Sequence, residues 1–128
     1  MFYSYNITVA ATYDEDAPKK DYLDLSAGVI HQVDLIFPDN STKDIYVRIF
    51  HGSLQLIPTN RLGAIRADNT IISTREFFEL PAGNSQLVIH SWNEHATDPF
   101  LLTVNIGVLS KKVMQPLSFD DLLKAALG

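Results

Sequence analysis

Short runs in which apolar and polar residues alternate recur along the whole chain, and nearly all of them end at a turn-forming residue. The clearest covers residues 45–50, where Ile45, Val47 and Ile49 fall on one face of an extended strand, because successive side chains of a strand point to opposite sides. Alternating runs bounded by Gly, Pro, Asn or Asp are typical of antiparallel sheets with one buried face. The pattern therefore predicts an all-β chain.

The alternating segments and the turn signals between them give a strand count. We expect strands at residues 5–12, 20–25, 28–37, 43–51, 54–57, 70–80 (interrupted), 86–92 and 99–109. Eight strands is the number in a jelly roll, in which two antiparallel sheets pack face to face. The expected fold class is thus an all-β, antiparallel, jelly-roll-like β-sandwich of about eight strands with a short C-terminal helix.

Two segments show which residues should form the core. In segment 99–109 the face made of every second residue is apolar throughout, and in segment 28–37 the corresponding face contains one histidine, His31, as its single exception. The predicted core faces are Phe100, Leu102, Val104, Ile106 and Val108 in one segment and Val29, His31, Val33, Leu35 and Phe37 in the other.

The length and composition indicate one folded domain. The 128 residues are 46% hydrophobic and 20% charged, close to the globular average, and no linker divides them. We expect a β-sandwich domain with an N-terminal arm over 1–109, and a connector and amphipathic helix over 110–128.

The charge argues against several classes of partner. The net charge is -5, and adjacent basic residues occur only at Lys19-Lys20 and Lys111-Lys112, so we expect no direct contact with nucleic acid. Cysteine is absent, which excludes disulfides and thiolate metal sites. The sequence shows no long apolar stretch and no secretion signal. We therefore expect that the protein is synthesised in a cytoplasm and does not associate with a membrane.

Both ends of the chain are candidates for contacts with partner proteins. Near the start, Phe2, Tyr3 and Tyr5 have no charged neighbours, and we interpret them as an arm that orders either against another chain or against the edge of the sandwich. Near the end, Ser118 can cap a helix whose apolar stripe packs either on its own sandwich or on a neighbouring subunit. That stripe consists of Phe119, Leu122, Leu123, Ala126 and Leu127.

No pattern in the sequence indicates catalysis. The segment from His90 to His95 has the wrong spacing for a zinc-protease motif, G-x-S-x-G is missing, and the glycines form no phosphate-binding loop. The paired carboxylates Glu76 and Glu79 are explained more simply as residues of an edge strand. We therefore expect no enzymatic activity, no catalytic residues, no metal and no cofactor.

One aromatic residue leaves a second function open. Trp92, next to Asn93 at the end of a strand, could stack on a sugar ring if it is exposed, or could belong to the core with its N–H hydrogen-bonded. If Trp92 is the residue on which a sugar stacks, a carbohydrate- or receptor-binding module predicts that it is exposed in a groove with polar neighbours such as Asn93 and Glu94. A module that only binds other proteins allows Trp92 to be buried.

Over residues 7–109 the chain resembles short single-domain β-sandwich proteins found among the structural genes of tailed bacteriophages. The features that carry the resemblance are Gly28-Val29-Ile30-His31, Val47-Arg48-Ile49-Phe50, Leu56-Ile57-Pro58-Thr59-Asn60, Thr70-Ile71-Ile72-Ser73, Glu76-Phe77-Phe78-Glu79-Leu80, Ser91-Trp92-Asn93 and Val104-Asn105-Ile106-Gly107-Val108-Leu109.

The resemblance implies a virion component, namely a capsid cement or decoration protein. Such a protein would be a homo-oligomer, a dimer or trimer, that contacts the major capsid protein or another virion protein. The apolar ends of the chain would then supply the partner-binding residues: Phe2, Tyr3, Tyr5, Phe119, Leu122, Leu123 and Leu127.

Overall fold

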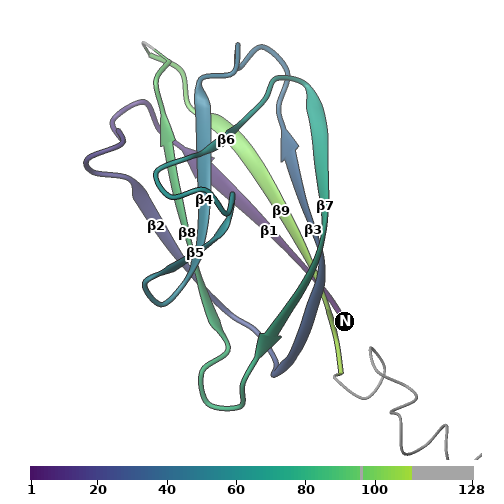
Figure 1. The fold of residues 1–128 in the computed structure, drawn as a ribbon. Coiled ribbons are helices and arrows are strands. Elements are labelled where there is room, and N and C mark those ends of the chain that lie inside the picture. Colours follow the sequence, from purple (N-terminus) through teal and green to yellow (C-terminus); the bar gives the residue numbers. More distant parts are fainter. Residues whose placement is uncertain (96, 111–128) are drawn as a thin grey trace, which may run out of the picture.

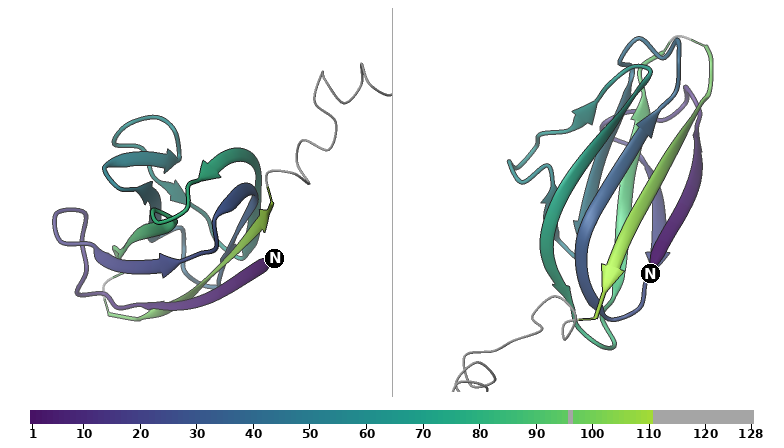
Figure 2. Two further views of the ribbon diagram at one scale, coloured as in Figure 1. Left: turned by 90° about the horizontal axis from the view of Figure 1, so that it is seen from below. Right: turned by 90° about the vertical axis from the view of Figure 1, so that its right-hand side faces the viewer.

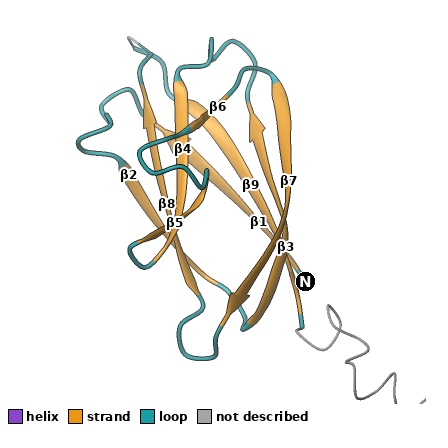
Figure 3. Cartoon of the chain, in the orientation of Figure 1, coloured by secondary structure: helices purple, strands orange, loops and turns teal. Residues whose placement is uncertain are grey.

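The structure is a computed structural model that describes residues 1–95 and 97–110. These residues form nine strands: β1 (Phe2–Val9), β2 (Lys19–Asp24), β3 (Gly28–Phe37), β4 (Ile45–His51), β5 (Leu54–Ile57), β6 (Ile65–Arg66), β7 (Thr70–Leu80), β8 (Gln86–Asn93) and β9 (Phe100–Leu109) (Figure 3). The expectation of an all-β chain is confirmed. The predicted C-terminal helix and its residues Phe119, Leu122, Leu123 and Leu127 lie outside the described residues.

The strands form two antiparallel sheets that pack face to face (Figure 1). Sheet A has the order β1-β9-β3-β7, and its strands lie side by side in the right-hand view of Figure 2. Sheet B has the order β2-β8-β4-β5, and the two-residue β6 also pairs with β4. The first four strands alternate between the sheets, so the β-sandwich is built from contacts between distant parts of the chain.

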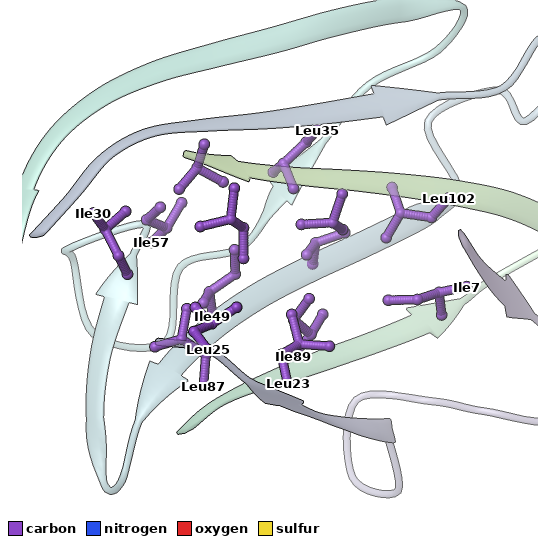
Figure 4. Close-up of a cluster of buried hydrophobic side chains, with 14 of the residues drawn as sticks. Ile7, Leu23, Leu25, Ile30, Leu35, Ile49, Ile57, Leu87, Ile89 and Leu102 are labelled. Atoms are coloured by element: carbon purple, nitrogen blue, oxygen red, sulfur yellow. The ribbon is translucent and has the colours of Figure 1, made fainter. Parts of the chain in front are cut away.

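The core lies between the sheets and follows from strand alternation. In β4 the side chains of Ile45, Val47 and Ile49 are at most 1% exposed, as the alternating pattern predicts. Leu87 and Ile89 of β8 are fully buried against them (Figure 4). Sheet A contributes Leu102, Val104, Ile106 and Val108 from β9 and Ile30, Val33, Leu35 and Phe37 from β3.

The predicted core face of β3 is wrong at the start of the strand, where neither His31 nor the buried Val29 belongs to the core cluster. The pairing register of β3 shifts between Ile30 and Gln32, and this bulge places Ile30, instead of His31, in the core. The ring of His31 lies over Gly107 on the outer face of sheet A, where a Cβ on that glycine would come within 2.6 Å of the histidine Nε2 atom. The bulge therefore removes the one polar side chain from an otherwise apolar row.

Other differences concern where strands begin and end. The first strand covers Phe2–Val9 rather than 5–12. Phe2, Tyr3 and Tyr5 therefore order against the sandwich, one of the two expected outcomes, by pairing with β9 as part of β1. The strand β7 is continuous over Thr70–Leu80, but its pairing with β3 skips Glu76 and Phe77, so the expected interruption of 70–80 takes the form of a register shift within one strand. The strand β6 was not expected, since two residues are too few to show alternation.

We predict that neighbouring leucines of β9 differ sharply in their contribution to stability. Leu102 is fully buried in the core, whereas Leu101 is 49% exposed. Leu102→Ala should lower the free energy of unfolding by about 2–5 kcal/mol, because it leaves a cavity. Leu101→Ala should change it by less than about 1 kcal/mol. Urea denaturation followed by circular dichroism measures both, and equal losses would contradict this assignment of the core.

Candidate functional site

The outer faces of the two sheets differ in chemistry. On sheet A the outer face mixes small polar pairs with scattered exposed apolar side chains: the Thr103 hydroxyl donates to Asn6 at 2.9 Å and Gln32 donates to Asp34 at 3.2 Å, while Phe2 and Leu101 are exposed. On sheet B the outer face carries aromatic and cationic side chains. The outer face of sheet B is therefore the stronger candidate for ligand recognition.

Three rows of side chains cross the outer face of sheet B, and the pairing register defines each row. The cationic row consists of Lys20 of β2, His90 of β8 and Arg48 of β4, because His90 is opposite both of the others. On one side of it lies the apolar row of Tyr22, Val88 and Phe50. On its other side lies the stacked row of Trp92, Tyr46 and Arg66.

The side chains of the stacked row pack on one another. The rings of Tyr46 and Trp92 are parallel, with their centroids 5.2 Å apart. The guanidinium carbon of Arg66 lies 4.5 Å from the Tyr46 ring centroid, and that of Arg48 lies 4.7 Å from the Trp92 ring centroid. Such cation–π contacts hold the arginines against the sheet. Burial raises the pKa of Tyr46, as does a hydrogen bond with Glu94.

Arg48 ties the surface loops to the sheet. Its Nε donates to the Gly63 carbonyl at 2.7 Å, and its Nη2 donates to the Leu62 carbonyl at 2.7 Å and to Glu15 at 2.9 Å. The residue is only 9% exposed. Its charge is therefore partly compensated, and its main contribution is to position the loops that border the face.

His90 is surrounded by cationic and aromatic groups. Its ring lies 4.5 Å from that of Phe50, centroid to centroid. Burial lowers the pKa of His90 below its usual value of 6.5, and the charges of Lys20 and Arg48 lower it further. The neutral imidazole is thus favoured in the folded protein, which leaves it able to bind a proton when an anion approaches.

Two hollows open beside these rows. One, of 380 Å³, is lined by Lys20, Tyr22, Phe50, Gly52, Ser53, Val88 and His90. The other, of 480 Å³, is lined by Arg48, Phe50, Ser53, Leu54, Gln55, Thr59, Arg61 and Leu62. Phe50 and Ser53 belong to both, so the hollows adjoin, and the φ of 60° at Gly52 forms the tight turn from β4 to β5 between them.

The residues proposed for sugar binding from sequence have structural contacts instead. Trp92 is 1% exposed and packs against Tyr46 and Arg48, so no sugar ring can stack on it as it lies here. Asn93 is 2% exposed, and its amide donates to the carbonyls of Val9 and Asp98 at 2.9 and 2.8 Å. Asn93 therefore connects the end of β1 to the loop before β9.

The three aromatic residues at the start of the chain separate into two groups. Tyr3 and Tyr5 pack against the core, and the Tyr3 hydroxyl donates to Ser26 at 2.9 Å. Phe2 is 66% exposed on the outer face of sheet A, and its ring makes a T-shaped contact with that of His31, with the centroids 5.8 Å apart. Among these three, Phe2 has the most surface to offer a partner.

The histidines near the end of β8 do not come together. His90 lies in the cationic row, whereas His95 follows β8 and accepts from the backbone N–H of Asp98 at 3.0 Å. In the part of the chain that the structure describes, no three His, Asp or Glu side chains gather as they would around a metal ion. No helix suited to crossing a bilayer is found among residues 1–95 and 97–110.

Comparison with known proteins gives no relative: no family model, no curated protein and no solved structure matches the chain. The outer face of sheet B must therefore be interpreted from its own chemistry. The sequence alone did not reveal this face, although the residues between Ile45, Val47 and Ile49 already indicated one outward face. The sequence alone does not show the pairing register of β2 and β8, which places Lys20 beside His90.

We predict that removing the charge of Lys20 raises the pKa of His90 toward 6.5. Lys20→Met should do so because one of the two cations that disfavour the imidazolium is lost. NMR titration of the His90 ring protons measures the shift. Lys19→Met is the matched control, because Lys19 precedes Lys20 on the opposite face of β2 and pairs with Asp21 at 3.6 Å.

The lowered pKa also sets the sign of a stability effect. Because the folded state binds the proton of His90 less readily than the unfolded chain, His90 favours folding above about pH 6.5 and loses that contribution as the pH falls through its folded-state pKa.

For the Lys20→Met variant, an unchanged pKa of His90 would contradict the proximity of the Lys20 and His90 side chains.

Proposed function

We propose that the chain is a jelly-roll decoration or cement protein of a tailed-phage capsid, which acts by binding neighbouring chains and carries out no reaction. A jelly roll is a long hairpin rolled up so that the first strand pairs with the last, the second with the second last, and so on inward. The pairs β1·β9, β2·β8, β3·β7 and β4·β5 support this topology, with the short β6 as an addition.

The observation that carries the proposal is the apolar character of the sandwich edges. Sheet A ends at β1 and β7, and sheet B ends at β2 and β5. Every one of these strands bears a large exposed apolar or aromatic residue: Phe2 (66%), Tyr22 (60%), Leu54 (57%), Ile71 (59%) and Phe77 (52%). Soluble proteins usually protect edge strands with charges or proline. Strands β2 and β7 carry such charges, whereas β1 and β5 have no charged residue, so the edges at β1 and β5 are the ones that favour contacts between chains.

A cleft between two of these edges adds to the apolar surface. It has a volume of 230 Å³ and opens between β5 and β7, where Leu54, Phe77 and Phe78 line it together with core residues such as Ile30 and Leu87. A partner that inserts one or two apolar side chains there would extend the core across the interface. The C-terminal stripe of a neighbouring copy has the residue types for such a contact.

In this proposal the partner-binding residues are Phe2 at the start and Phe119, Leu122, Leu123 and Leu127 near the end. The protein assembles as a dimer or trimer and contacts the major capsid protein or another virion protein. Many weak contacts repeated on a symmetric shell give strong attachment without any tight single site. A rigid sandwich with no reaction chemistry is sufficient for this task.

We predict that the native protein sediments with a megadalton particle. In a nuclease-treated sample from its source, separated on a sucrose gradient, antibodies should detect it in the particle fraction at a fixed ratio to the most abundant shell protein. The reason is that repeated apolar contacts hold it on the lattice. Detection only among small soluble proteins would contradict the assignment.

A second experiment tests the predicted stripe on the same particles. Leu122→Asp combined with Leu123→Asp should weaken rebinding to stripped shells by at least about tenfold, because the proposed interface would lose two apolar side chains. Lys124→Asp, on the predicted polar side of the same helix, is the control and should rebind normally. Circular dichroism verifies that each variant keeps its sheets. Unchanged rebinding of the double variant would remove the stripe from the interface.

A further inference from the structure

The outer face of sheet B brings together cationic, aromatic and hydroxyl-bearing side chains, of which the proposed capsid contacts use only Tyr22. The cationic row and the apolar row lie next to each other, about 7 Å apart, because they are two residues apart along each strand. The two adjoining hollows open over these rows, and each lies within the range of small-molecule sites.

We propose that this face is a binding site for an acidic sugar, in which Lys20, His90 and Arg61 bind the anionic group and Tyr22 and Phe50 pack against the sugar ring. The site goes beyond the proposed capsid function and does not depend on it. It would give the protein a second, outward-facing role in attachment to acidic carbohydrate.

The two hollows are lined by cationic side chains and by no acidic ones among the described residues. Lys20 and Arg61 are exposed side chains at the two hollows. A positive site without a carboxylate is notable in a chain whose net charge is -5. Arg48 adds positive electrostatic potential to the site, but its guanidinium already donates hydrogen bonds to Glu15 and to two backbone carbonyls. Within the described part of the chain no ion pair involves Lys20 or Arg61, so these two lining cations are available to a ligand.

Uncharged side chains at the hollows supply ring surface and hydroxyl groups. Tyr22 is 60% exposed, and the half-buried Phe50 lies at the junction of the two hollows. Aromatic rings offer an apolar surface to the C–H face of a sugar. Ser53 and Thr59 present hydroxyls within reach of sugar hydroxyls, and both line the larger hollow. This combination of ring surface, hydroxyls and cations matches a sugar that carries a carboxylate or sulfate.

The backbone argues against an acidic peptide as the ligand. Extended peptides are usually bound along a free strand edge, through unpaired main-chain groups. The rows lie on the face of a sheet, where β8 is paired on both sides by β2 and β4. Recognition at this face must therefore come from side chains.

The test compares the binding of an acidic oligosaccharide with that of its uncharged methyl ester. Tetragalacturonic acid and its fully methyl-esterified form share one carbohydrate skeleton and differ in charge. Each is titrated into the full-length protein at low salt, with binding followed by calorimetry and by the NMR signals of His90. We expect the acid to bind and to raise the pKa of His90, and the ester to bind at least about tenfold more weakly, because charge-assisted hydrogen bonds are lost.

Variants identify the site. Lys20→Ala combined with Arg61→Ala should lose at least about tenfold in affinity for the acid. The matched control, Lys19→Ala combined with Arg75→Ala, removes the same charge from the opposite face of β2 and from β7 of sheet A, and should bind as the wild type does. All four positions lie outside the buried core, so both double variants should fold.

Three results would overturn the proposal: equal binding of the acid and the ester, equal affinity in the two double variants, or failure of the acid to bind the wild type. Equal binding of tetraglutamate or of a four-nucleotide single strand would also overturn it, because the face would then recognise charge and not sugar. None of these results bears on sedimentation with the particle, so the two proposals fail separately.

Discussion

The pairing register of β8 is the constraint on which the rest of the structure depends. The strand lies between β2 and β4, and its inward residues Leu87 and Ile89 are fully buried in the core. Because side chains alternate, the same register turns Val88, His90 and Trp92 outward. A shift by one residue would bury His90 and expose Ile89, so the apolar core fixes the outer face as well.

This coupling explains how a chain of net charge -5 concentrates cations on one face. Lys20 and Arg48 are 28 positions apart in the sequence, yet each is opposite His90. The stacking of Trp92 on Tyr46 and the hydrogen bonds from Arg48 to the loops then hold the face rigid. A rigid arrangement binds a ligand with little loss of side-chain freedom. The same rigidity suits a block that is built into a larger assembly.

Local patterns in the sequence predicted much of the fold but little of the candidate site. Alternation in residues 45–50 and 99–109 correctly identified core faces, because burial of one face of a strand leaves a period of two in the sequence. His31 was misplaced, since a bulge changes the period without a local signal. Trp92 was left open, because its burial depends on Tyr46 and Arg48 of another strand. The cationic row was missed for the same reason: register is a property of strand pairs and not of single segments.

The register of β8 can be measured directly by NMR in solution. The account predicts cross-strand nuclear Overhauser effects that connect backbone protons of His90 with those of both Lys20 and Arg48, together with contacts between the Tyr46 and Trp92 rings. Contacts that place Ile89, instead of His90, opposite Lys20 and Arg48 would contradict the account, because the cations and aromatic rings would then no longer share one outer face.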